Sequence, residues 1–89
     1  MPRLFIRHRV SEYDAWRRAY ADFEPTRRHM GVLGDAIYRS VADANDVTVT
    51  HDFGTADGAN AFIESAELRD AMAKAGVVGE PQVWITEPA

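Results

Sequence analysis

The order of strand-like and helix-like segments most constrains the fold of this chain. In three segments apolar and polar residues alternate, as they do in half-buried strands, and a fourth segment is rich in β-branched and aromatic residues. Two longer stretches between them carry apolar residues at intervals of three and four, which is typical of amphipathic helices. The expected order is β-α-β-β-α-β, with strands over residues 3–10, 35–41, 47–53 and 82–87.

The first helical stretch is expected to consist of two pieces. Ser11 has the side chain of a helix N-cap, and Asp14 follows three residues later, as in a capping box. Pro25 lacks a backbone donor and disfavours helical geometry at the residue before it, which predicts a kink or a restart. A further turn should run to about Met30, before Gly31 ends the helix.

The second helical stretch also contains an internal capping residue. Thr55 can cap its first piece, Ser65 can cap its second piece, and Gly76 supplies a C-terminal stop. Residues 43–46 form a turn by composition, so the second and third strands should pair as a hairpin. We expect Gly79-Glu80-Pro81 to form a loop that leads into the last strand.

This order predicts one α+β domain over residues 1–89 with a ferredoxin-like fold. Right-handed crossovers interleave two split β-α-β units into a four-stranded antiparallel sheet, with the helices on one face and the first and third strands in the middle. A domain of 89 residues buries only about 60–65% of its unfolded surface, and the chain has no cysteine for a disulfide. We therefore expect a homodimer, because association is the remaining way to enlarge the core.

Two histidines occupy strand positions at which the alternation calls for apolar residues. His8 shares a strand face with Leu4 and Ile6, and His51 shares one with Val47 and Val49. Unpaired buried polar groups cost roughly 1–3 kcal/mol each, so the positions indicate either two well-paired core histidines or a polar pocket inside an apolar shell. If the central strands pair centre to centre, the imidazoles are diagonal neighbours about 7–8 Å apart.

An aromatic stripe on the first helical stretch should face these histidines. Its members are Tyr13, Trp16, Tyr20 and Phe23. Such a stripe is either ordinary core packing or, opposite two imidazoles, the wall of a pocket for a flat ligand.

The candidate site combines the histidines with these and two further aromatic residues. Imidazole suits proton transfer in either direction because its pKa is near neutrality. Tyr38 joins the site only if it faces the helices; otherwise Ile37 does, and Tyr38 belongs to a subunit interface. We predict His8 and His51 as catalytic residues, and the following substrate contacts: Tyr13, Trp16, Tyr20, Phe23, Tyr38 and Trp84.

Charge and motifs exclude several classes of function. The net charge of −4 argues against a nucleic-acid partner, which favours a basic face. The pairs Arg17-Arg18 and Arg27-Arg28 are interpreted as solvated helix faces, with an anion-steering rim as the alternative. No nucleotide-binding glycine loop, metal-binding helix or nucleophile elbow is present, so we expect neither a cofactor nor a metal. Without a signal peptide or a long apolar segment, the chain is expected to be cytoplasmic, with no membrane partner.

Three phrases of the sequence carry a family resemblance. They are Asn45-Asp46-Val47-Thr48-Val49, Ser65-Ala66-Glu67-Leu68-Arg69-Asp70-Ala71-Met72 and Ala75-Gly76-Val77-Val78-Gly79-Glu80-Pro81. With the element order, they make the chain similar to small proteins of the dimeric α+β barrel superfamily, near its antibiotic biosynthesis monooxygenase-like branch, which are often labelled cyclase or monooxygenase. The resemblance implies a homodimer with two facing sheets and a pocket beside His8 and His51.

The resemblance identifies no catalytic residue. The phenol-oxidising and haem-degrading branches use a pocket asparagine beside a tryptophan, whereas Asn45 is expected in a turn and Asn60 near a helix start. We expect a cofactor-independent cyclase, isomerase or monooxygenase that acts on an aromatic or polyketide-like metabolite by histidine acid-base chemistry. The alternative is a non-catalytic ligand-binding or structural dimeric module with His8 and His51 as paired core residues. That alternative predicts a hydrogen-bond partner for each ring and no cavity beside them.

Overall fold

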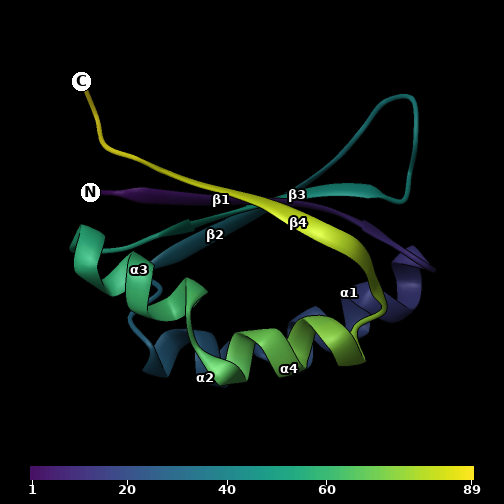
Figure 1. Ribbon diagram of the computed structural model, residues 1–89, viewed down its shortest axis with the longest axis horizontal. Coiled ribbons are helices and arrows are strands. Elements are labelled where there is room, and N and C mark those ends of the chain that lie inside the picture. The colour runs from purple at the N-terminus through teal and green to yellow at the C-terminus, as the bar shows by residue number, and fades with distance from the viewer.

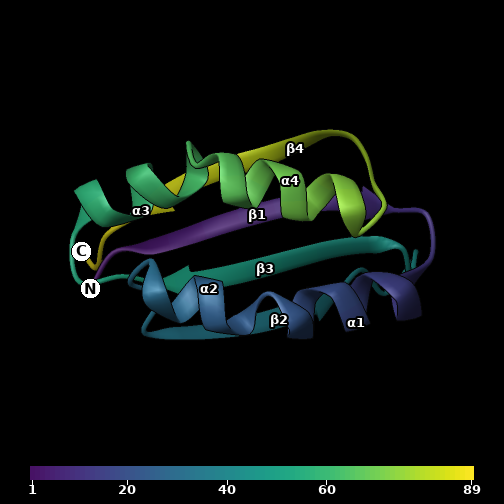
Figure 2. The same cartoon turned by 90° about the horizontal axis from the view of Figure 1, so that it is seen from below.

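A four-stranded antiparallel sheet carries all the helices on one of its faces, as the computed structural model of residues 1–89 shows (Figures 1 and 2). The strand order is β2-β3-β1-β4, so β1 and β3 are central, and the predicted α+β ferredoxin-like fold is confirmed. The elements are β1 (Arg3–Val10), α1 (Tyr13–Asp22), α2 (Glu24–His29), β2 (Gly34–Arg39), β3 (Asp46–Asp52), α3 (Ala56–Ile63), α4 (Ala66–Lys74) and β4 (Val77–Thr86).

The helices form two pairs that cover different halves of the sheet. In Figure 2, α1 and α2 lie over β2 and β3, whereas α3 and α4 lie over β1 and β4. The core lies between these layers, where Leu4, Val47 and Val49 of the central strands are buried together with Trp16 and Phe62 of the helices. None of these short helices is long and apolar enough to cross a membrane.

Capping residues and a proline divide each helical stretch into two helices, as predicted. α1 ends at Asp22, and Pro25 lies in the first turn of α2, where its missing donor is harmless. The Thr55 hydroxyl accepts a hydrogen bond from a backbone N–H of the first turn of α3 at 3.0 Å. The Ser65 hydroxyl does the same for α4 at 3.1 Å.

The N-cap of α1 is Glu12, so the prediction of Ser11 was wrong. The carboxylate of Glu12 accepts hydrogen bonds from the backbone N–H groups of Asp14 and Ala15, at 3.1 and 2.9 Å. The backbone N–H of Ser11 instead donates to the carbonyl of Gly76 at 2.9 Å. Residue 11 is therefore still tied to the start of β4, and the helix begins after it.

The last strand is longer than predicted, because Gly79-Glu80-Pro81 belongs to β4. The register between β1 and β4 shifts between Arg7 and Arg9, which marks a β-bulge. Gly79 lies opposite this irregularity with a φ of 75°, a conformation that favours glycine. Pro81 is tolerated because β4 is an edge strand. Glycine and proline here indicate a bulge and not a loop.

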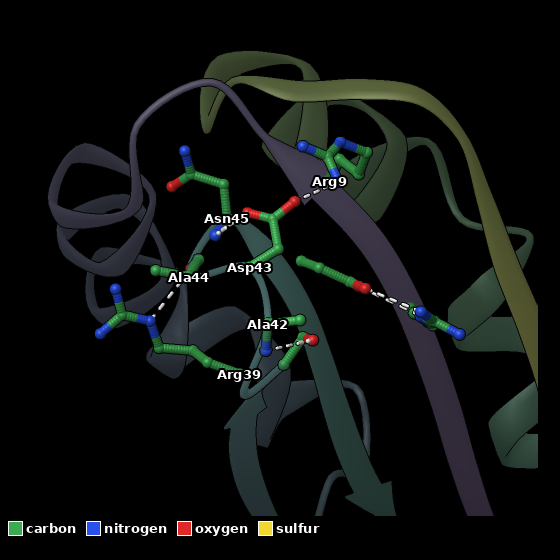
Figure 3. Close-up of polar contacts among 9 residues, drawn as sticks. Arg9, Arg39, Ala42, Asp43, Ala44 and Asn45 are labelled. Atoms are coloured by element: carbon green, nitrogen blue, oxygen red, sulfur yellow. Dashed lines mark hydrogen bonds and ion pairs between the residues drawn. The ribbon is translucent and has the colours of Figure 1, made fainter.

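Polar contacts hold the tip of the β2–β3 hairpin against β1 (Figure 3). The Asp43 carboxylate accepts a hydrogen bond from the backbone of Asn45 at 3.0 Å and forms an ion pair with Arg9. The Arg39 guanidinium donates to the carbonyl of Ala44 at 3.0 Å. The predicted turn is confirmed, although β2 ends at Arg39 and not at residue 41.

The opposite face of the sheet is covered by no other element (Figure 1). The rings of Phe5 and Trp84 stack there with centroids 5.2 Å apart, and Tyr38, on the edge strand at the other side of the sheet, is 58% exposed on the same face. Ion pairs of 2.7 Å flank these rings, between Arg3 and Asp52 and between Arg7 and Asp46. This face therefore combines exposed aromatic area with a polar surround.

Candidate functional site

A cavity of about 40 Å³ lies between the sheet and the helices. One water needs about 10–15 Å³ of such space, so the cavity has room for a few waters, whereas metabolite pockets usually measure about 300–1,000 Å³. Its walls are largely apolar, with histidines from the sheet and one arginine from α2. The lining residues that matter below are Ile6, His8, Val49, His51, Trp16, Tyr20, Phe23 and Arg27.

A surface groove of about 440 Å³ lies outside this cavity, between the first helical stretch and α4. Cavity and groove share three lining residues, Ala19, Phe23 and Ala71, which we call the neck. A ligand of metabolite size that reaches the cavity from this side would keep most of its body in the groove.

The two histidines face the helices from adjacent central strands, as predicted, but they are farther apart than predicted. His8 pairs with Val47, which lies four residues before His51 on β3. At about 3.3 Å per residue, their backbones are about 13 Å apart along the sheet. The expectation of diagonal neighbours about 7–8 Å apart was wrong, because the Ile6–Val49 pair lies between them.

Neither histidine ring has a hydrogen-bond partner in the protein. Nδ1 and Nε2 of both rings are buried and unpartnered. The His8 ring lies edge-on to Trp16 at 5.7 Å, and the His51 ring is 5.3 Å from Phe62. Burial lowers the pKa of His8; burial and, secondarily, the charge of Arg27 lower the pKa of His51 to about 4. Both rings are therefore neutral at pH 7 and carry an acceptor nitrogen.

Trp16 and Tyr20 connect the two histidines across the helix side of the cavity. Successive ring centroids lie 5.7 Å apart from His8 to Trp16, 5.0 Å from Trp16 to Tyr20, and 6.2 Å from Tyr20 to His51. The Tyr20 hydroxyl donates to the Asp35 carboxylate at 2.5 Å, and burial raises the pKa of Tyr20. The tyrosine therefore presents its ring, and not its hydroxyl, to His51.

Three of the predicted substrate contacts lie outside this cavity. Tyr13 packs under the guanidinium of Arg39, which is 3.7 Å from its ring centroid. Tyr38 and Trp84 lie on the uncovered face of the sheet, because strand alternation turns their neighbours Ile37 and Ile85 toward the core. Of the two alternatives for Tyr38, the structure therefore shows the one in which Ile37 faces the helices and Tyr38 lies on the other face.

Arg27 is buried in the cavity wall, contrary to its interpretation as part of a solvated helix face. Its side chain is 6% exposed, whereas that of Arg28 is 71% exposed, as expected. Its guanidinium donates to the carbonyl of Tyr20 and lies 3.8 Å from the Tyr20 ring centroid. The burial of Arg27 could have been predicted from the sequence, since residue 27 follows Phe23 by four positions and lies on the same helix face as the aromatic stripe.

The structure lacks both features predicted by the non-catalytic alternative. A cavity lies beside the histidines, and neither ring has a hydrogen-bond partner. No group of three or more His, Cys, Asp or Glu side chains lies together in an arrangement that could hold a metal ion.

No protein-family model and no curated protein matches the sequence. Solved structures match it over nearly the whole chain. A protein from Bordetella bronchiseptica, proposed to be an antibiotic biosynthesis monooxygenase, has a TM-score of 0.82 and 19% identity, covering 99% of this chain and 96% of that one. SnoaB, a cofactor-independent oxygenase from Streptomyces nogalater, has a TM-score of 0.80 and 9% identity, covering 99% and 92%. Identities this low show the fold alone: the chain has the fold of the antibiotic biosynthesis monooxygenase proteins, as its sequence predicted.

Proposed function

We propose that this protein is a small-molecule enzyme in which His51 and His8 transfer protons at opposite ends of one cavity. The observation that carries the proposal is the set of four buried, unpartnered ring nitrogens on an apolar cavity wall. Because an unpartnered buried polar group costs roughly 1–3 kcal/mol, packing gives no reason for imidazole at these positions. A ligand that exchanges protons or hydrogen bonds with these nitrogens supplies that reason.

The protonation state of His51 makes it a proton acceptor at neutral pH. A proton taken by His51 creates a buried imidazolium near Arg27, which is unfavourable unless the ligand becomes an anion at the same moment. With a pKa of about 4, His51 is a weak base without a ligand, so the removal of a proton from an acidic hydroxyl or from a carbon next to a carbonyl requires that the new ligand anion raise this pKa.

The separation of the histidines limits the reaction type. Residues about 13 Å apart along a sheet do not act on one atom. One ring can take a proton at one position of the ligand while the other returns a proton elsewhere, which is the pattern of an isomerisation or a cyclisation. Cofactor-independent oxygenation, the activity in SnoaB's description, is the other class and would consume O₂.

The size of the cavity limits how a ligand binds. A polyketide-like or other aromatic metabolite does not fit into about 40 Å³. We infer that a narrow segment of the ligand enters through the neck and lies along the cavity between the two histidines, while the remainder lies in the groove between the helices. The apolar neck suits a flat aromatic segment of the ligand, whereas the rest of the groove is lined by polar side chains, among them Asp22, Glu67 and Asp70.

The test is turnover of a panel of aromatic hydroxy-ketones by the wild type, His51→Gln and His8→Gln. Glutamine keeps polarity but does not act as a base, so we expect a loss of about 10²–10⁴-fold in kcat/KM for His51→Gln. His29→Gln is the matched control, because His29 is exposed at the end of α2. Product mass and O₂ uptake separate oxygenation from isomerisation. Unchanged rates in both cavity variants would reject the acid-base roles, and tight binding without turnover in the wild type would favour a binding module.

A further inference from the structure

We propose that Arg27 is the specificity-determining residue of the cavity, and that it selects ligands with an anionic oxygen, either a carboxylate or an ionised hydroxyl, at the His51 end. This rests on the proposed function and deepens it by naming the chemistry of the ligand. The residues predicted from the sequence, which are the two histidines and the aromatic stripe, do not indicate which chemical group of the ligand is recognised.

Arg27 is buried without full pairing of its charge. Its side chain is 6% exposed, and of its five N–H donors one is used in a hydrogen bond to the carbonyl of Tyr20. The nearest carboxylate, that of Asp35, is 3.9 Å from Nη2, and it already accepts the Tyr20 hydroxyl proton at 2.5 Å. Because buried charges are costly unless they are paired, the guanidinium is suited to bind an anion.

The positive charge lies at the same end of the cavity as His51. The Arg27 guanidinium lies 3.8 Å from the Tyr20 ring centroid, and the His51 ring is 6.2 Å from that centroid. Arg17 adds a second guanidinium 5.7 Å from the same centroid, so two cations and the half-exposed Asp35 surround this ring. The apolar cavity wall strengthens the field of the buried Arg27, whereas Arg17 and Asp35 are exposed and screened by solvent.

This arrangement completes the proton transfer to His51. The O–H or C–H bond of the ligand breaks heterolytically, the proton bonds to a ring nitrogen of His51, and the electron pair stays on the ligand as an oxyanion or enolate. The new negative oxygen would lie between the imidazolium and Arg27, so both cations stabilise it. A carboxylate ligand would instead use Arg27 for binding alone.

A purely structural role makes a different prediction. The carbonyl of Tyr20 near the C-terminal end of α1 accepts hydrogen bonds both from the backbone N–H of Phe23, at 3.2 Å, and from the guanidinium of Arg27, so Arg27 links α2 to the end of α1. If that were its whole role, loss of Arg27 would lower stability and would not change which ligands bind.

The experiment measures binding of three matched probes, para-nitrobenzoate, para-nitrophenol and para-nitrotoluene, by the wild type, Arg27→Gln and the control Arg28→Gln. We expect the wild type to bind the charged probes roughly 10–100-fold more tightly than the neutral one. Bound para-nitrophenol should ionise at lower pH than in water, which its visible absorbance reports. Arg27→Gln should lose this preference and keep its affinity for para-nitrotoluene, whereas Arg28→Gln should behave as the wild type. Arg27→Lys, which keeps the charge, serves if Arg27→Gln does not fold, and should retain the preference.

Each outcome separates the alternatives. Tighter binding of the benzoate than of the phenolate identifies a carboxylate ligand, and the reverse identifies an acidic hydroxyl. Equal binding of all three probes by the wild type, or a preference that survives in Arg27→Gln, would overturn the role of Arg27 and leave the histidine chemistry intact. Failure of the wild type to bind any probe would overturn both this role and the proposed aromatic ligand.

Discussion

His51 should make the fold sensitive to acid. Its pKa rises from about 4 in the folded protein to the ordinary 6.5 on unfolding, so the unfolded chain binds more protons between these values. The free energy of unfolding should therefore fall as the pH drops from 6.5 toward 4, by about 3 kcal/mol at 1.36 kcal/mol per unit. His8, whose pKa burial also lowers, adds to the loss in the same direction. Urea unfolding at neutral and at mildly acidic pH measures this loss of unfolding free energy.

Two variants show whether His51 causes this dependence. His51→Gln should make the change of stability with pH smaller, because the larger contribution is gone while that of His8 remains. His29→Gln should keep the wild-type dependence, because His29 is exposed. A His51→Gln protein that loses as much stability in acid as the wild type would contradict the assignment.

Alternation predicts the face of each histidine but not their separation. Successive strand residues point to opposite faces, so the sequence placed both rings toward the helices. A register shift by two residues leaves every side chain on the same face, so the pattern does not distinguish a diagonal pair from the observed offset. The distance between the histidines is decided by which residues of β1 pair with which residues of β3. That register depends on contacts along the whole length of both strands.

The N-cap of α1 offers a direct test of where this helix begins. Glu12→Ala removes two hydrogen bonds to first-turn N–H groups and should lower the free energy of unfolding by about 1 kcal/mol. Ser11→Ala should be close to neutral, because its hydroxyl does not cap the helix. Thermal or urea unfolding of both variants measures the difference. The opposite ranking would restore Ser11 as the cap.

The bulge in β4 can be tested with two exposed glycines of different backbone conformation. A Cβ added at Gly79 or at Gly54 meets nothing within 4 Å, but Gly79 has a φ of 75°. Gly79→Ala should therefore lower the free energy of unfolding by about 1–2 kcal/mol through backbone strain. Gly54→Ala should have little effect or stabilise slightly. Equal effects in urea unfolding would show that the strand relaxes at residue 79.

Short-range signals predicted most element boundaries, and long-range contacts account for the exceptions. Thr55, Ser65 and Pro25 act within a turn of their own position, so the sequence located the helix breaks correctly. Ser11 and Gly79 are set by pairing with distant strands, β4 and β1 respectively. Local composition therefore predicted a cap at Ser11 and a loop at Gly79, whereas long-range contacts impose a hydrogen bond to Gly76 at the first position and a bulge at the second.

The uncovered sheet face is where we expect a second copy of the chain to bind. Phe5, Trp84 and Tyr38 leave aromatic area exposed there, and a domain of this size gains from association. The wild type should be a homodimer by light scattering, and Trp84→Glu should shift it to monomer because it would bury a charge at the interface. Val41→Glu, at the exposed hairpin tip, is the control. A monomeric wild type, or a dimeric Trp84→Glu protein, would contradict this expectation.

The strand order also governs how the chain folds. Contacts of β1 with its neighbours join residues 49 and 83 positions apart, as the Arg3–Asp52 and Thr86–Arg3 hydrogen bonds show. β1 is thus a central strand that precedes both of its partners in the chain, so it pairs only after they have been made. Distant pairings of this kind slow folding, because the chain loses the entropy of loop closure before the stabilising contacts form. Until β3 and β4 pair with it, β1 has no partner strand, and Leu4 and Ile6, which are buried in the folded chain, remain exposed to water.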